Sequence, residues 1–232
     1  MRLGINRDWR NRWFAATPKQ QREYIRTSHA IRTFLSKKLK GMAIDSIQID
    51  RDAKTLRVLI KTAKPGIIIG RSGEGATTLR KQVDLLLRTL KLTEKPEIKI
   101  DIEEVKAIET SASIVGQMVA EGLEKRMQFR RVLKQTIEKV MANRDVKGVR
   151  IILSGRLGGA DMARQEELKK GRIPLQTLRA DIDFARERAT LPYGVIGVKV
   201  WIYRGDVFED RKGNQDDKKS QAAQRRPART TA

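Results

Sequence analysis

Residues 64–75 read Lys-Pro-Gly-Ile-Ile-Ile-Gly-Arg-Ser-Gly-Glu-Gly, a pattern that few folds accommodate. Four glycines fall within its last ten residues, and Arg71 lies between two of them. Glycine has no Cβ, so the backbone can adopt conformations and close approaches that other residues resist. We therefore expect the backbone of this loop to be a binding surface.

Two nucleotide-binding motifs fail on their spacing. A P-loop needs Gly-x-x-x-x-Gly-Lys-Ser/Thr, but only three residues separate Gly66 from Gly70, and an arginine follows. A dinucleotide fingerprint needs Gly-x-Gly-x-x-Gly, and Thr78 stands where its third glycine should be. The Gly-x-x-Gly of residues 70–73 instead fits a KH loop, whose backbone approaches the phosphates of about four nucleotides. A plain turn with a helix-capping glycine is the alternative that the tetrapeptide alone leaves open.

The flanking sequence favours the KH interpretation. Alternating apolar residues over 44–49 and 56–60 predict a two-stranded hairpin. Helical spacing over 31–39 and 79–90 predicts two helices, and alternating isoleucines over 98–102 predict another strand. The order helix, strand, strand, Gly-x-x-Gly, helix, strand resembles a type II KH domain. The loop residues expected to contact RNA are Gly66, Ile69, Gly70, Arg71, Ser72 and Gly73.

The second half of the chain predicts a different α+β unit. Helix-capping residues at 110–113 precede apolar stripes over 114–123 and 129–141, which predict two helices. Runs at 148–153, 163–172, 178–184 and 195–203 predict about four strands of an antiparallel sheet under them. The glycine-rich loop after the first of these strands contains Arg156 and predicts a second phosphate contact. The expected fold class is α+β, with a type II KH domain followed by a two-helix, four-stranded domain.

We expect four segments along the chain. Residues 1–20 form a basic and aromatic arm, in which Trp9 and Trp13 anchor the arm and the arginines contact RNA. Residues 21–105 form the KH domain, and residues 106–207 form the second domain. Residues 208–232 lack periodicity and are predicted to be a disordered basic tail.

The excess of positive charge limits the partners. The chain has 50 Lys and Arg against 28 Asp and Glu, a net charge of +22. Such self-repulsion is expected where a polyanion neutralises it. Nucleic acid is the first candidate and an anionic membrane surface the second. Because no apolar run approaches the roughly 20 residues of a spanning helix, we expect no membrane partner and a cytoplasmic or organellar location.

The residue types exclude much catalytic chemistry. There is no cysteine, and the single histidine, His29, is expected to be packed or solvated. Asp181 and Asp183 could be paired acids or metal ligands, but Arg179 and Arg186 near them favour a surface ion-pair network. We predict no enzyme activity, no metal, no cofactor and no small-molecule substrate.

A basic helical face shows where residue spacing alone is ambiguous. Arg130, Arg131 and Lys134 fall within one arc of the second predicted helix of this half, because successive helical residues turn by about 100°. Spacing by itself favours an ordinary solvated surface for such a run.

Six motifs in order resemble the family of bacterial-type small-subunit ribosomal protein three. They are residues 65–70, 129–131, 154–160, 171–175, 178–183 and 193–202. The chain departs from the family pattern at its start, where Met1-Arg2-Leu3-Gly4 stands without a preceding Gly-Gln-Lys-Val-His-Pro segment. The resemblance implies a protein of the head of the small ribosomal subunit that contacts rRNA and neighbouring ribosomal proteins.

The resemblance also assigns roles to residues. It implies that Arg130, Arg131 and Lys134 lie at the mRNA entrance and help to part structured message. Further rRNA contacts are expected at Arg2, Arg156, Gly158, Gly159, Arg164, Arg172 and Arg179. Two alternatives from other classes remain, a free-standing KH regulator and an enzyme such as a helicase or a DNA lyase. The sequence has no nucleotide loop for an independent helicase, and a lyase would need a lysine of depressed pKa.

Overall fold

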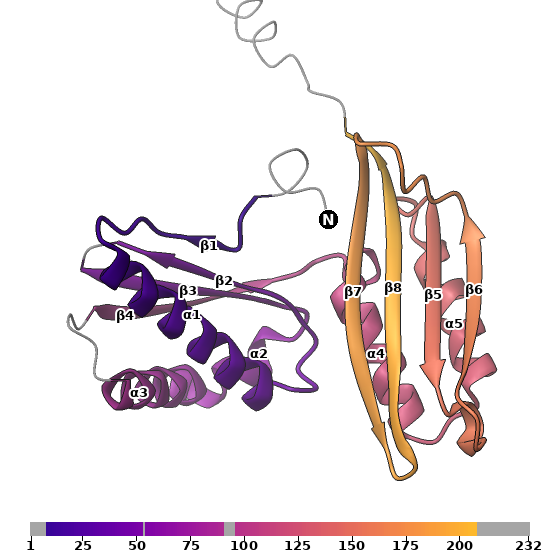
Figure 1. Cartoon of the computed structure of the whole chain (residues 1–232), viewed down its shortest axis with the longest axis horizontal. Helices are drawn as coiled ribbons and strands as arrows, with labels where there is room; N and C mark the ends of the chain where they lie inside the picture. Colours follow the sequence, from indigo (N-terminus) through magenta and orange to yellow (C-terminus); the bar gives the residue numbers. More distant parts are fainter. Residues whose placement is uncertain (1–7, 53, 91–95, 208–232) are drawn as a thin grey trace, which may run out of the picture.

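The computed structural model describes residues 8–52, 54–90 and 96–207, which form two α+β units side by side (Figure 1). The expectations for Arg2 and for the tail lie outside the described residues. The expected fold class is confirmed, because each unit combines two long helices with a four-stranded sheet. No helix among the described residues has the length and apolar character needed to cross a membrane.

The N-terminal unit has the predicted element order. Its elements are α1 (Pro18–Lys38), β2 (Ile44–Arg51), β3 (Thr55–Thr62), α2 (Pro65–Ile69), α3 (Glu74–Thr89) and β4 (Glu97–Glu104). Strand β3 pairs antiparallel with β2 and parallel with β4. Helices α1 and α3 lie together on one side of this sheet (Figure 1), and their apolar stripes join its isoleucines and valines in one buried core.

Helix α1 begins well before the residues that predicted it. Its N-cap is Thr17, whose hydroxyl accepts a hydrogen bond from the Gln20 amide, and Pro18 occupies the first turn. Both are ordinary start signals of a helix. Lys37 and Lys38 lie in its last turn, where cations favour the negative end of the helix dipole. The helix is therefore longer than its buried stripe.

The N-terminal arm is anchored by one of its two tryptophans. The short strand β1 (Asn11–Arg12) pairs with β2, and Trp13 packs edge-to-face on Tyr24 with ring centroids 5.6 Å apart. Arg51 covers the same tyrosine at 3.7 Å. Trp9 is 63% exposed. The expectation that both tryptophans anchor the arm is therefore wrong for Trp9, because only Trp13 reaches the tyrosine.

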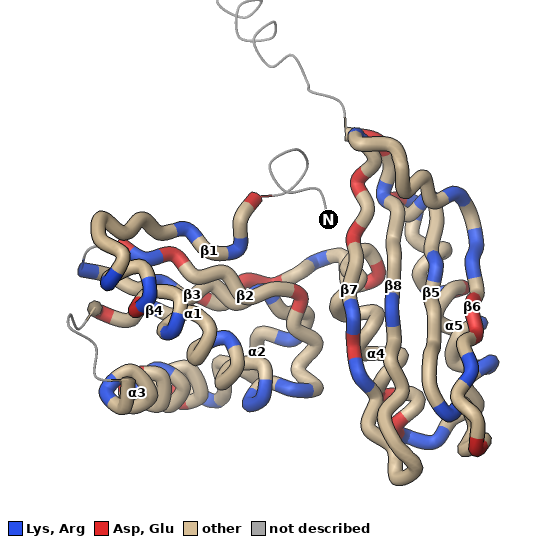
Figure 2. Tube along the Cα trace, in the orientation of Figure 1, with Lys and Arg blue, Asp and Glu red and all other residues tan. Residues whose placement is uncertain are grey.

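The C-terminal unit is a sheet covered on one side by two helices. Its elements are a short turn of helix η2 (Ile108–Thr110), α4 (Ala112–Glu124), α5 (Phe129–Ala142), β5 (Gly148–Gly155), β6 (Arg164–Gly171), β7 (Ala180–Leu191) and β8 (Gly194–Asp206). The strand order is β6-β5-β8-β7, with every pair antiparallel. Helices α4 and α5 pack on one face of the sheet (Figure 1). Each of the four strands carries Lys or Arg (Figure 2).

The predicted strands of this unit are confirmed with shifted ends. The third strand begins at Ala180 rather than at Leu178, which is 66% exposed. A register shift between Asp181 and Ile182 interrupts its pairing near that end. Ile182 and Phe184 belong to the apolar alternation that predicted this strand, yet they lie outside the buried core, which takes Ala189 and Leu191 instead. The bulge depends on how β7 meets β8, so neither this end nor the inward face beside it could be located from the pattern.

Candidate RNA-binding surfaces

The Gly-x-x-Gly loop joins two helices through a sharp change of backbone direction. Gly70 ends α2 with φ 71° and ψ −174°, and its amide donates to the Gly66 carbonyl at 2.9 Å. Ser72 has φ 52°, and Gly73 has φ 81°. The αL region is costly for most residues and free for glycine. Gly70, Arg71 and Ser72 are exposed, so the loop offers its backbone and one cation to solvent.

The glycines of this loop do two different things. A Cβ built on Gly75 would lie 2.4 Å from the Ile68 carbonyl oxygen, so this glycine lets α3 begin against α2. A Cβ on Gly73 or on Gly66 would meet nothing within 4 Å. Gly75 is thus required for packing, whereas the space above Gly73 and Gly66 is free for a ligand that approaches the backbone.

Two exposed isoleucines lie beside the loop, and only one of them was predicted to contact RNA. Ile68 is 3% exposed and ties α2 to the core. Its neighbours Ile67 and Ile69 are 59% and 38% exposed. Ile69 was among the expected RNA contacts, but Ile67 was not. The exposure of Ile67 could have been predicted from the sequence, because burying Ile68 on so short a helix turns both of its neighbours outward.

The second candidate surface begins at the start of α5. Val132 and Leu133 are buried in the C-terminal core, and Arg130, Arg131 and Lys134 are exposed. The predicted division of this helix into an apolar and a basic face is therefore confirmed. The role of the basic face is a separate question.

The glycine-rich loop after β5 is held in shape by its own arginine. Arg156 donates from Nε to the Ala160 carbonyl at 2.8 Å, from one terminal nitrogen to the Tyr193 carbonyl at 3.2 Å, and from the other to Asp161 at 3.1 Å. Gly158 and Gly159 have positive φ values of 70° and 81° and are exposed. Through these hydrogen bonds Arg156 stabilises the conformation of the loop. Its expected contact with rRNA stays a prediction.

The structure brings some of the expected site residues together and separates others. Arg130, Gly158 and Arg164 meet around Phe129, in one cavity. Arg164 begins β6 opposite Gly155, whereas Arg172 follows the strand's other end. Eight residues of strand span about 26 Å, so Arg172 belongs to the far end of the sheet. Arg179 lies there too, 3.6 Å from Asp206 at the end of β8.

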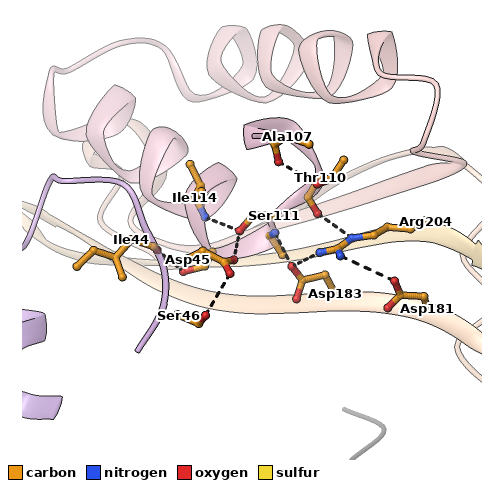
Figure 3. A network of polar contacts seen from close by, with 12 residues as sticks. Ile44, Asp45, Ser46, Ala107, Thr110, Ser111, Ile114, Asp181, Asp183 and Arg204 are labelled. Carbon is orange, nitrogen blue, oxygen red and sulfur yellow. Dashed lines mark hydrogen bonds and ion pairs between the residues drawn. The ribbon is translucent and has the colours of Figure 1, made fainter. Parts of the chain in front are cut away.

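A polar network joins the two units where the chain crosses between them (Figure 3). Gln117 of α4 exchanges two hydrogen bonds with the backbone of Ile44 at the start of β2, at 3.2 and 2.8 Å. Ser113 donates to the same carbonyl at 3.0 Å. The hydroxyl of Ser111, the N-cap of α4, donates to Asp45. Because the last turn of the linker and the first turn of α4 both take part, the units are fixed where the chain crosses between them.

Two residues of the C-terminal sheet, Asp183 and Arg204, extend the same network (Figure 3). The Asp183 carboxylate accepts from the Ala112 amide at 2.8 Å and from Arg204 at 3.0 Å. The Nε of Arg204 also donates to the Thr110 carbonyl at 3.1 Å, and its Nη1 lies 3.9 Å from the Asp181 carboxylate. A carboxylate at the first amides of a helix is favoured by the helix dipole.

The expectation of a surface ion-pair network is therefore wrong for Asp183. Asp183 is only 5% exposed, and it pairs with Arg204, which lies 21 residues further along the chain. Pairing of β7 with β8 brings these residues together. The described residues contain no group of three or more His, Cys, Asp or Glu side chains that could hold a metal ion.

A cavity of about 530 Å³ lies between the units beside this network. Its charged lining has both signs: Arg10, Arg32, Lys40, Asp45, Glu121, Glu124, Glu187 and Arg188. Burial raises the pKa of the Glu187 carboxyl, while a hydrogen bond with Gln117 and the charge of Lys40 act in the opposite direction. This mixed lining is less suited to a polyanion than the two surfaces described above.

Comparison with known proteins agrees with both units. A family model described as KH domain matches residues 30–110, and one described as Ribosomal protein S3, C-terminal domain, matches residues 119–202. Small ribosomal subunit protein uS3 of Caldicellulosiruptor bescii is 47% identical over 210 residues, which cover 90% of this chain and 91% of that protein. The uS3 protein of Streptococcus mutans is 43% identical, over 94% of this chain and 96% of its own. Small ribosomal subunit protein uS3c of Cyanophora paradoxa is 42% identical, over 89% and 91%.

Proposed function

The chain belongs to the uS3 family of small ribosomal subunit proteins, and on this premise we propose that its basic face on α5 grips incoming mRNA. Membership confirms the resemblance that the six motifs indicated. The protein is a structural constituent of the small ribosomal subunit rather than an enzyme, and its partners are rRNA and other ribosomal proteins. The grip on mRNA, and the residues that contact each RNA, are the parts that we propose.

The observation that carries this proposal is the one-sided character of α5. Its apolar side packs in the core, and its other side presents Arg130, Arg131 and Lys134 to solvent near the start of the helix. Contacts of such cations with phosphates hold a strand in register without reading its sequence. A strand held in this way cannot easily pair again with its complement, so the face would favour passage of unpaired message.

The proposal assigns a different RNA to the Gly-x-x-Gly loop. Gly66 and Gly73 leave space above the backbone, and Arg71 adds a cation. In a KH loop these features suit a short single-stranded backbone, and the rRNA of the subunit supplies such segments. The interdomain network would then hold the rRNA-bound loop and the basic face of α5 in one fixed arrangement.

The test is translation through a hairpin by small subunits that carry Arg130→Ala, Arg131→Ala and Lys134→Ala together. Alanine is a strong helix former, and exposed substitutions usually change stability by within about 0.5 kcal/mol. We expect normal assembly, near-normal elongation on an unpaired message, and slower elongation on a message with a stable downstream hairpin.

A matched control is Lys139→Ala with Arg144→Ala, which removes one exposed cation from the last turn of α5 and one from the segment that follows the helix. Lys139 lies about 13 Å along the helix axis from Arg130, and Arg144 lies beyond the same end of the helix, so the control should translate both messages normally. Equal slowing of the triple variant on both messages would indicate an assembly defect. No slowing on either message would leave the basic face as ordinary solvated surface.

A further inference from the structure

A cavity of about 540 Å³ opens where the start of α5 meets the loop after β5. Its walls include Arg126, Met127, Phe129, Arg130, Gly158 and Arg164. No carboxylate is among its lining residues, and three of them are arginines. Pockets of several hundred Å³ with apolar walls and a few well-placed polar groups typically bind small organic molecules. The arginines restrict the ligand to an anion with an apolar or aromatic part.

The ring of Phe129 forms part of the cavity wall. The ring is half-buried and packs against the core of the C-terminal unit. The guanidinium carbons of Arg130 and Arg164 each lie 5.6 Å from its centroid. A Cβ on Gly158 would lie 4.0 Å from the edge of the ring. Glycine at this position therefore places no side-chain atoms beside the ring.

A carboxylate outside the cavity already sits between the two arginines. Glu166 lies 3.4 Å from Arg130 and 3.9 Å from Arg164. Both distances exceed those of a close charge-assisted hydrogen bond, about 2.7–2.9 Å. An arginine fork matches the oxygens of a phosphate in the same way as those of a carboxylate. The two cations are thus oriented toward an anion that they hold only loosely.

We propose that this cavity binds one unpaired nucleotide of a single RNA strand, with its base against Phe129 and its phosphate on Arg130 and Arg164. This inference rests on the proposed function, because it names the part of the message that the start of α5 would take. Stacking on an aromatic ring accepts every base, since each base has a π face. A base within a duplex is already stacked and paired, so only an unpaired nucleotide can enter.

In this arrangement Glu166 is a competitor for the phosphate. Its carboxylate holds the two guanidinium groups in the free protein and is displaced from them when RNA arrives. Replacing it by the isosteric neutral amide, Glu166→Gln, removes the competing charge and keeps the shape. That variant should bind a phosphate strand several-fold more tightly, a gain that a loss of folding could not produce.

The test measures binding of the full-length protein to two probes of ten ribose-phosphate units. One strand is abasic throughout, and the other carries three adjacent adenines at its centre. Both are measured in a background of Arg71→Asp with Ser72→Asp, which removes attraction at the Gly-x-x-Gly loop. We expect Phe129→Leu to weaken the adenine-bearing strand roughly five- to a hundred-fold, the range of one lost base stack. Binding of the abasic strand should stay the same.

A matched control is Phe184→Leu, a partly buried ring in the same unit that packs on Trp201 with centroids 4.9 Å apart. It should change neither probe. No effect of Phe129→Leu on the adenine strand, or equal weakening of both probes, would overturn the nucleotide site. Equal binding of both strands by the Glu166→Gln protein and its parent would overturn the competing role of the carboxylate.

Failure of the proposed function gives a different result. Arg131 and Lys134 do not line the cavity, so Arg131→Ala with Lys134→Ala tests the phosphate grip alone and should weaken both probes. If this pair changes the binding of neither probe while Phe129→Leu still weakens binding of the adenine strand, the proposed contact with message phosphates is refuted and the nucleotide site is supported. If the pair weakens both probes while Phe129→Leu changes neither, the nucleotide site is refuted and the phosphate contact is supported.

Discussion

Asp183→Ala should destabilise the C-terminal unit more than any other single loss of a carboxylate near the linker. The substitution removes the acceptor for the Ala112 amide, at 2.8 Å, and the partner of Arg204, at 3.0 Å. Ala112 is fully buried, so its amide has no route to water. The first turn of α4 then begins without its carboxylate.

The magnitude follows from three overlapping costs. A hydrogen bond to a charged group contributes about 1.5–3 kcal/mol, and an unsatisfied buried donor costs about 1–3 kcal/mol. Breaking a fully buried ion pair costs about 3–5 kcal/mol, but the Arg204 side chain is 33% exposed and keeps Asp181 at 3.9 Å. Because these terms share the same groups, we expect a loss of about 3 kcal/mol rather than their sum.

The assay is urea unfolding followed by the fluorescence of Trp201, in a background with Trp9→Phe and Trp13→Phe so that only the C-terminal unit is observed. Amide hydrogen exchange at the start of α4 provides a second measurement and should become faster. The control is Asp181→Ala, which removes the longer contact to Arg204 and should cost less than about 1 kcal/mol. Equal destabilisation by the two variants would refute the role assigned to Asp183.

Two further outcomes are expected. Burial raises the pKa of Glu187, so the folded state binds its proton more tightly than the unfolded state, and this contribution to stability is lost as the pH rises. Glu187→Gln should therefore raise the melting temperature at pH 7, with an advantage that shrinks toward pH 4.5; an advantage that grows on acidification would contradict the stated sign. Arg71→Asp with Ser72→Asp should weaken rRNA binding with an unchanged circular dichroism spectrum, because both side chains are exposed and Ser72 already tolerates a positive φ. Loss of the spectrum would make the loop structural instead.

The glycines themselves are poorer probes of the same loop. A Cβ on Gly70 would lie 3.1 Å from the amide nitrogen of Gly75, at a φ of 71°. A substitution there would strain the backbone and confuse a lost RNA contact with a lost fold. Substituting Arg71 and Ser72, which lie between the glycines of the motif, avoids this difficulty.

The order of elements and the two charged surfaces could be predicted from local patterns in the chain. The Gly-x-x-Gly motif between a hairpin and a helix predicted the N-terminal unit, because alternation and helical spacing are local properties of the chain. The same periodicity separated buried Val132 and Leu133 from exposed Arg131 and Lys134. Identification of the family needed six motifs in order, since no single one of them was specific.

The contacts between residues that are distant in the chain depend on how the elements pack. Asp183 lies on the same alternating strand that predicted a surface network, yet pairing of β7 with β8 buries it against Arg204. Phe129 joins Arg164 because α5 packs over the sheet beside the start of β6. Local periodicity states which side of an element is apolar. It does not encode which element covers that side, and this choice is made by the packing of helices on a sheet whose strands come from remote parts of the chain.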